Sequence, residues 1–170
     1  AAIGAGVDAV MSTHIRLPAL DPTEGLPATL SRPILTGLLR QELGFDGLVF
    51  TDSMSMGAIV RGFPGGKAAA MAVGAGADVV LDPPDAEAAL RGIREAVERG
   101  EIARDEIDRS VARILRAKAR LSLHRARTVD VEAVPSSLGG RAREAVAAEV
   151  AAKAVTLLKD DRGQVPLRLP

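Results

Sequence analysis

One pattern occurs three times in the first half of the chain, and it constrains the fold more than any other feature. Residues 3–11 (IGAGVDAVM) and 73–81 (VGAGADVVL) are near copies, and residues 43–50 (LGFDGLVF) are a looser third copy. Each copy predicts a helix that ends at glycine, a turn that carries an aspartate, and a short apolar strand. Continuous apolar strands are typical of a parallel sheet that is buried on both faces. The pattern therefore predicts parallel strands joined by helices.

Helices are predicted in the segments between these strands. Ser31 is placed to cap a helix that has Pro33 in its first turn, and a second helix is expected over about 67–75. Asp85 can cap a third helix, and a fourth is expected near 104–121. The apolar faces of the last two are predicted to comprise Ala86, Ala89, Leu90, Ile93 and Val97, and then Ile107, Val111, Ile114, Leu115 and Leu121. This alternation of strand and helix predicts an α/β layer or barrel.

The sequence changes character after Leu123. Residues 124–139 contain His124, Arg125, Arg127, Pro135, two serines and Gly139, which is typical of a linker. A helix is predicted over about 141–153, followed by a strand-like segment at 155–158. Because a lone strand is unstable and a barrel of this class needs eight strands, we expect a chain truncated at both ends. The expected organisation is the late part of a (β/α)8 TIM barrel at 1–123, a linker at 124–139, and the start of a second domain at 140–170.

Composition excludes several kinds of partner. Lysine plus arginine and aspartate plus glutamate both number 22, so the net charge is zero and gives no reason to expect nucleic acid or an anionic membrane. Aromatic residues make up only 2%, which argues against stacking on nucleic-acid bases. The absence of cysteine excludes disulfides and thiolate metal sites but leaves the cellular compartment open.

Candidate functional residues follow the predicted strands, because reactive groups of parallel α/β folds lie at the carboxyl ends of strands. His14 follows the first strand, Asp52 the second and Asp82 the third. Each has an ordinary alternative: Asp52 can cap a helix, His14 can be a packed loop residue, and Asp82 precedes two prolines and favours a simple turn. His124 lies in a basic stretch that is typical of a solvated helix face.

The segment from residue 28 to residue 59 resembles glycoside hydrolase family 3. The similarity lies in 28–40 (ATLSRPILTGLLR) and 42–59 (ELGFDGLVFTDSMSMGAI), and it is closest to the β-N-acetylhexosaminidase branch. Residues 10–15 (VMSTHI) and 18–22 (PALDP) resemble the same branch, and 155–159 (VTLLK) resembles the opening of the αβα sandwich domain that follows the barrel in two-domain members. The resemblance covers nearly the whole chain.

The resemblance implies a site and a reaction. In this family the aspartate of the Thr-Asp element is the nucleophile, which places that role on Asp52; His14 and Met54 are expected to border the sugar. The branch takes its acid/base from a histidine in a Lys-His-Phe-Pro-Gly-His-Gly-type loop, which does not occur in these residues. The implied activity is retaining hydrolysis of a terminal β-N-acetylglucosaminide, such as a cell-wall muropeptide, or of a β-glucoside. No metal or other cofactor is implied, and the remaining barrel strands are expected in cis.

Two other functions remain open from the residues alone. Repeated strand–helix units also suit a barrel lyase or aldolase acting on phosphorylated sugars, which would need a Schiff-base lysine or a phosphate loop. Lys67 is the only lysine before Lys118, and it lies near a helix start. A non-catalytic fragment is the third possibility.

Overall fold

The computed structural model describes residues 1–166 and divides the chain into two compact units, 1–125 and the residues from 126 onward. Each unit is described by itself. The last four residues of the expected second domain, 167–170, lie outside the described part of the chain.

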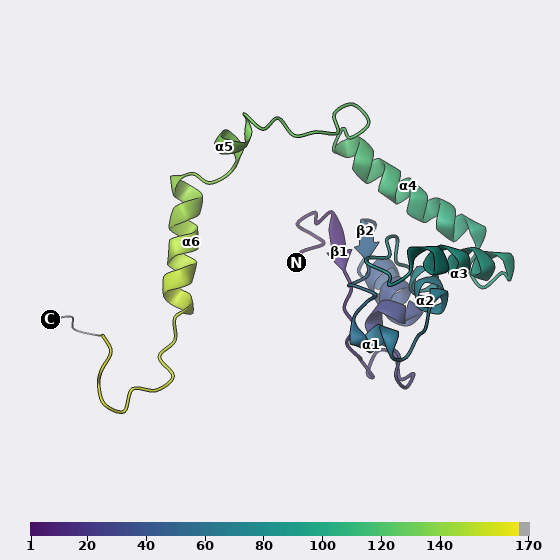
Figure 1. Cartoon of the computed structure of the whole chain (residues 1–170), viewed down its shortest axis with the longest axis horizontal. Helices are drawn as coiled ribbons and strands as arrows, with labels where there is room; N and C mark the ends of the chain where they lie inside the picture. Colours follow the sequence, from purple (N-terminus) through teal and green to yellow (C-terminus); the bar gives the residue numbers. More distant parts are fainter. Residues whose placement is uncertain (167–170) are drawn as a thin grey trace. The chain divides into compact units, whose positions relative to one another are not determined.

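A small parallel sheet organises the first unit. Strands β1 (Ala9–Met11) and β2 (Leu48–Phe50) pair in parallel, with Val10 opposite Val49. The third predicted strand is reduced to a single parallel bridge between Phe50 and Val79, on the other side of β2. Figure 1 shows β1 and β2 side by side, with the neighbouring helices lying to one side of them. The predicted parallel arrangement is therefore confirmed, with β2 in the middle.

One glycine in each copy of the repeated pattern adopts the backbone conformation that the end of a helix requires. Gly6, Gly44 and Gly76 have φ angles of 83°, 68° and 120°, a region that side-chain-bearing residues rarely occupy. In the second and third copies this glycine follows a helix, as predicted. In the first copy residues 2–6 form turns, so the helix expected there is absent.

The segment between β1 and β2 folds into two helical elements. A short 3-10 helix, η1 (Ala28–Leu30), leads into η2 (Pro33–Glu42), which has the wider hydrogen-bond pattern of a π-helix. Ser31 has an extended backbone, and its hydroxyl accepts the Ile34 amide at 3.3 Å. This is the contact that an N-cap makes, so the predicted cap is confirmed.

Three α-helices follow β2. They are α1 (Gly57–Val60), α2 (Gly66–Ala75) and α3 (Ala86–Glu98). Asp85 caps α3 as predicted, because its carboxylate accepts the Ala88 amide at 2.9 Å. Helices α2 and α3 pack closely where Gly66 faces Gly92: a Cβ on Gly92 would lie 2.4 Å from the Gly66 carbonyl oxygen. The backbones can approach this closely because neither residue has a side chain.

The buried faces of the later helices differ from the prediction. In α3 Ala89 and Ala96 are buried, whereas Leu90 is 69% exposed. In α4 (Arg104–Arg120) no residue is fully buried: Ile107 and Ile114 are half-buried, whereas Val111, Leu115 and the following Leu121 are exposed. The core lies instead between the sheet and η1, η2, α1 and α2, and its fully buried side chains include Val49, Met54 and Ile59.

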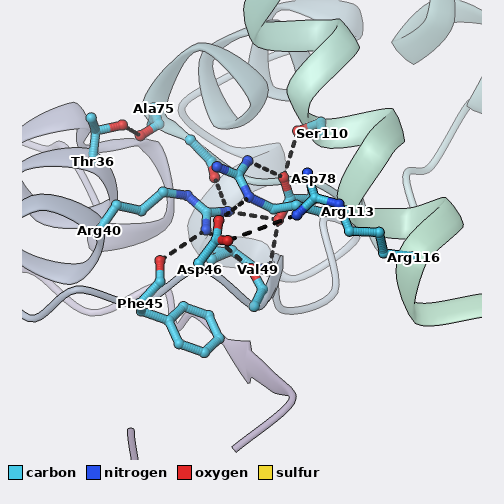
Figure 2. A network of polar contacts seen from close by, with 12 residues as sticks. Thr36, Arg40, Phe45, Asp46, Val49, Ala75, Asp78, Ser110, Arg113 and Arg116 are labelled. Atoms are coloured by element: carbon cyan, nitrogen blue, oxygen red, sulfur yellow. Dashed lines mark hydrogen bonds and ion pairs between the residues drawn. The ribbon is translucent and has the colours of Figure 1, made fainter. Parts of the chain in front are cut away.

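Helix α4 meets the sheet through charged side chains instead. Each copy of the repeated pattern carries an aspartate just before its strand, namely Asp8, Asp46 and Asp78. Arg120 pairs with Asp8 at 2.6 Å, and Arg113 pairs with Asp46 at 3.1 Å and with Asp78 at 3.2 Å. Figure 2 shows Arg113 of α4 between these last two carboxylates. The three aspartates therefore tie the amino-terminal ends of the strands to a single helix.

The second unit contains two helices, α5 (Val134–Ser137) and α6 (Arg141–Ala154). Helix α6 confirms the predicted helix over 141–153, and the short α5 lies within the segment expected to be a linker. Residues 155–158, expected to be a strand, are exposed and form no strand within the described residues. A β-strand needs a hydrogen-bonded neighbour, and none of the described residues supplies one. The predicted turn at 160–163 is present, with the Gly163 amide 3.2 Å from the Asp160 carbonyl oxygen.

Candidate functional site

Asp52 lies immediately beyond the carboxyl end of β2, as the sequence predicted. The preceding Thr51 is fully buried, and its hydroxyl accepts the Leu81 amide at 2.8 Å. Side chains alternate along an extended strand, so Asp52 points away from this buried contact and is only half-buried. One carboxylate oxygen, Oδ1, accepts the Ser53 amide at 2.8 Å, and Oδ2 has no partner within residues 1–166. Asp52 therefore presents a carboxylate oxygen that none of the described residues engages.

His14 follows the carboxyl end of β1 and reaches the loop that contains Asp52. Its Nε2 lies 2.9 Å from the Ser53 carbonyl oxygen, and its Nδ1 lies 2.9 Å from the hydroxyl of Thr29 in η1. Thr29 is fully buried and also receives a hydrogen bond from Ser12 at 3.0 Å. Both ring nitrogens of His14 are thus occupied by the protein.

Asp82 approaches the same loop from the third strand segment. Its Oδ2 accepts hydrogen bonds from the hydroxyls of Ser53 and Ser55, both at 2.7 Å. These two hydroxyls hold the pKa of Asp82 below its ordinary value of 3.8. Asp82 has a φ angle of 48°, a conformation that aspartate tolerates better than most residues. The sequence favoured a simple turn here, but residues 81–83 form no hydrogen-bonded turn, and the Asp82 carboxylate is bound to the Asp52 loop instead.

Met54 is held in the core beneath this loop. It is 2% exposed, and its amide donates to the Leu81 carbonyl oxygen at 2.9 Å. Its side chain is one of those lining a cavity of about 240 Å³ that also includes Ile59, Phe63 and Pro84. Met54 was expected to border the sugar, and a contact with substrate stays a prediction for a side chain this deeply packed.

The remaining candidates lie apart from this loop. His124 is exposed at the end of the first unit. Lys67 lies in the first turn of α2 and lines a cavity of about 570 Å³ between helices, not the strand ends. Within residues 1–166, no group of three or more histidine, cysteine, aspartate or glutamate side chains could hold a metal ion. No helix of that part of the chain is long and apolar enough to cross a membrane.

Sequence reasoning missed two partners in this site, Thr29 and the Ser53–Asp82 pair. Residues 14 and 29 are 15 positions apart, and residues 53 and 82 are 29 positions apart. The available signal was general: parallel strands bring their carboxyl ends to one edge of the sheet. It predicts that strand ends meet but not which side chains touch.

A parallel sheet packed against helices, with polar side chains gathered at the carboxyl ends of its strands, is the arrangement of the parallel α/β class, which includes the α/β barrels. The model of the Glycosyl hydrolase family 3 N terminal domain matches residues 1–117. The chain belongs to glycosyl hydrolase family 3.

Named relatives agree with this family and show how much of each the chain represents. A β-N-acetylglucosaminidase/β-glucosidase of Cellulomonas fimi is 34% identical over 98% of this chain and 31% of its own length. β-Hexosaminidase A of Pseudoalteromonas piscicida is 31% identical over 94% of this chain and 29% of its own. The chain thus spans about a third of the length of these curated relatives.

Solved structures show the same fold. A family 3 β-N-acetylglucosaminidase from Paenibacillus superposes with a TM-score of 0.77 at 40% identity, covering 94% of this chain and 31% of the other. A β-glucoside phosphorylase superposes with a TM-score of 0.78 at 28% identity, covering 97% of this chain and 32% of the other. The fold is therefore of the TIM-barrel type found in this family, although the described residues contain few strands.

Proposed function

We propose that this chain is part of a retaining glycoside hydrolase in which Asp52 is the nucleophile. The observation that carries the proposal is the position of Asp52: its carboxylate follows a central strand, is half-buried, and keeps Oδ2 without a partner in residues 1–166. A nucleophilic carboxylate needs one unengaged oxygen that can approach the anomeric carbon. The family supplies the reaction class in which such an aspartate is used.

The reaction has two steps. In the first, a carboxylate oxygen of Asp52 forms a bond to the anomeric carbon while the bond to the leaving oxygen breaks and that oxygen takes a proton from the acid/base. In the second, the acid/base takes a proton from water, and the water oxygen displaces Asp52. The retaining mechanism places the two groups about 5–5.5 Å apart when both are carboxylates. The acid/base and most sugar-binding residues are expected in the part of the enzyme that precedes this chain.

The proposed substrate is a terminal β-N-acetylglucosaminide, for example a cell-wall muropeptide, with a β-glucoside as the second candidate. The support is the naming of the relatives, which include β-N-acetylglucosaminidases and β-glucosidases. The lyase or aldolase alternative loses its support, because the family is known and Lys67 lies away from the strand ends.

The test compares Asp52→Asn with Asp108→Asn in the intact enzyme, using an aryl β-N-acetylglucosaminide as substrate. Asp108 lies on the exposed side of α4, so its substitution controls for the loss of a carboxylate. We expect Asp52→Asn to lower kcat by about 10⁴-fold or more and Asp108→Asn to leave it unchanged. An Asp52→Asn enzyme within about tenfold of wild type would contradict the proposal.

A further inference from the structure

The loop after Asp52 is held at its first residue, Ser53. The backbone amide of Ser53 donates to Asp52, its carbonyl oxygen accepts from His14 at 2.9 Å and from the Met56 amide at 3.2 Å, and its hydroxyl donates to Asp82. Every polar atom of Ser53 is therefore bonded. Because the Ser53 amide also holds Oδ1 of Asp52, a rotation of Ser53 would turn the Asp52 carboxylate.

The contacts of His14 tie it to the protein on both sides of its ring. A carbonyl oxygen can only accept, so Nε2 of His14 donates to Ser53. Nδ1 lies 2.9 Å from the Thr29 hydroxyl, which also receives a hydrogen bond from Ser12. Both ring nitrogens are therefore engaged by the protein.

Asp82 holds the opposite side of the same residue. Its Oδ2 accepts hydrogen bonds from the hydroxyls of Ser53 and Ser55. The two hydroxyl oxygens are themselves 2.7 Å apart. Hydrogen bonds to an ionised carboxylate are about twice as strong as neutral ones. The side chains of His14 and Asp82 come from the two segments that flank β2, so Ser53 is held from both neighbours of the strand that carries Asp52.

We propose that His14 and Asp82 are positioning residues that hold Ser53 and thereby fix the direction of the Asp52 carboxylate. The proposal rests on the proposed function of Asp52. It assigns His14 a role through the protein backbone instead of a contact with the sugar. The expected effect is on the rate of glycosyl-enzyme formation, because a displacement of about 1 Å at a reacting group can cost about 10²-fold in rate.

The first experiment compares His14→Leu with His14→Gln in the intact enzyme, and His124→Leu is the matched control. Glutamine retains an N–H donor for the Ser53 carbonyl, whereas leucine has none. We expect His14→Leu to slow glycosyl-enzyme formation by about tenfold or more while KM changes by less than about threefold, and His14→Gln to recover most of the rate. The loss should be the same for poor and for activated aryl leaving groups, because positioning does not supply a proton.

Three results of that experiment would overturn the proposal. They are a His14→Leu enzyme as fast as the His124→Leu control, a His14→Gln enzyme no faster than His14→Leu, and a defect that disappears with an activated leaving group. The last result would make His14 the proton donor.

A second set of variants tests the Asp82 side without changing His14. Asp82→Ala and the double variant Ser53→Ala/Ser55→Ala each remove the hydrogen bonds between Asp82 and the two hydroxyls, so the triple variant that combines them should lose no more rate than the worse of its two parents. If the fold-losses in rate of the two parents instead multiply in the triple variant, Asp82 acts independently of the two serines. That result would overturn its assignment as a positioning residue. This set stands even if His14→Leu does not fold.

Failure of the inference and failure of the proposed function are separable. Wild-type enzyme is incubated with a slow fluorinated glycoside in the same series. The fluorinated sugar that stays bound to the enzyme is the label. If the wild-type enzyme hydrolyses substrate but never carries this label on Asp52, the proposed function is contradicted. A wild type that carries the label, together with His14 and Asp82 variants that acquire it at the wild-type rate, contradicts only the inference.

Discussion

The carboxylate of Asp78 is fully buried at the amino-terminal end of the strands, opposite the proposed site. It accepts the Val49 amide at 2.9 Å and the Ser110 hydroxyl at 2.5 Å, and it pairs with Arg40 at 2.6 Å and with Arg113 at 3.2 Å. Figure 2 shows these donors converging on Asp78 from β2, η2 and α4. Burial lowers the pKa of Arg40, while the neighbouring Asp78 raises it. Each charge in this network is therefore compensated only by its partners.

Asp78→Ala should destabilise the intact protein strongly. The substitution leaves the largely buried Arg40 without its carboxylate, and an unpaired buried charge costs about 3–5 kcal/mol. Asp46→Ala is the control, since the Asp46 side chain is 76% exposed and surface ion pairs contribute at most about 1 kcal/mol. Urea unfolding of the two variants measures the difference. Equal losses of stability would show that burial of the Asp78 network is not what stabilises the strand ends.

The lowered pKa of Asp82 predicts that the protein loses stability as the pH falls. This pKa is below 3.8 in the folded protein, so the contribution of Asp82 to stability is fully present above that value and is lost as the pH falls through the lower folded pKa. The urea midpoint of the wild-type protein should fall as the pH is lowered from about 5 to 2.5, and Asp82→Asn should make this fall smaller. Asp108→Asn, on the exposed side of α4, should keep the wild-type slope. The same slope in wild type and Asp82→Asn would contradict the hydrogen bonds described at the Asp52 loop.

Prediction at the residue scale succeeded where position along the chain was enough. The pattern of strand and turn placed Asp52 and His14 beyond strand ends, and family resemblance gave Asp52 its proposed role. Neither the pattern nor the resemblance showed that His14 contacts Thr29 and Ser53. Those contacts depend on the order of strands in the sheet, which a local pattern does not contain.

At the scale of elements, the crossing of α2 and α3 depends on two glycines. Gly92→Ala would place a Cβ 2.4–2.7 Å from backbone atoms of Gly66, and backbone cannot move aside as a flexible side chain can. We expect a loss of about 1–3 kcal/mol in unfolding free energy.

Gly74→Ala is the matched control for this crossing. A Cβ there meets only a side-chain atom of Ile102 at 3.5 Å, and alanine is the better helix former by about 1 kcal/mol. The two substitutions should therefore change thermal stability in opposite directions. A stabilising Gly92→Ala would contradict the close packing of these helices.

Helix positions were largely predictable from the sequence, but the buried faces were not. Capping by Ser31 and Asp85 follows from local chemistry, and both caps are present. The predicted face of α4 was only partly right: Ile107 and Ile114 are half-buried, whereas Val111 and Leu115 are exposed and arginines make the contacts with the strand ends. Similarly, Leu90 has the spacing of a core residue but is exposed in α3.

At the scale of the whole molecule, the chain spans about a third of the relatives it matches. We predict that residues 1–170 alone have no measurable glycosidase activity. The acid/base loop is not among them, and loss of proton transfer typically costs about 10²–10⁴-fold. The outer edges of β1 and of the segment at Val79 have no neighbouring strand within the described residues, which favours association.

Expression of residues 1–170, followed by an aryl β-N-acetylglucosaminide assay, circular dichroism and sizing, tests this prediction. The intact enzyme serves as the positive control. A soluble, cooperatively folded and active monomer would contradict it. The family and the general architecture were predictable from the sequence, whereas the strand-like segment at 155–158 was not formed, because a strand depends on neighbours that the sequence alone does not locate.

The most direct test of the role of Asp52 is to locate the covalent intermediate. The intact enzyme is incubated with a slow fluorinated glycoside, digested with trypsin and analysed by tandem mass spectrometry. Cleavage after Arg40 and Arg61 gives a peptide over 41–61 that contains Glu42, Asp46 and Asp52. We predict a sugar label on this peptide, fragment ions that place it on Asp52, and no label after Asp52→Asn. A stoichiometric label on any other residue, or an Asp52→Asn enzyme that is still labelled at the wild-type rate, would contradict the assignment of Asp52 as the nucleophile.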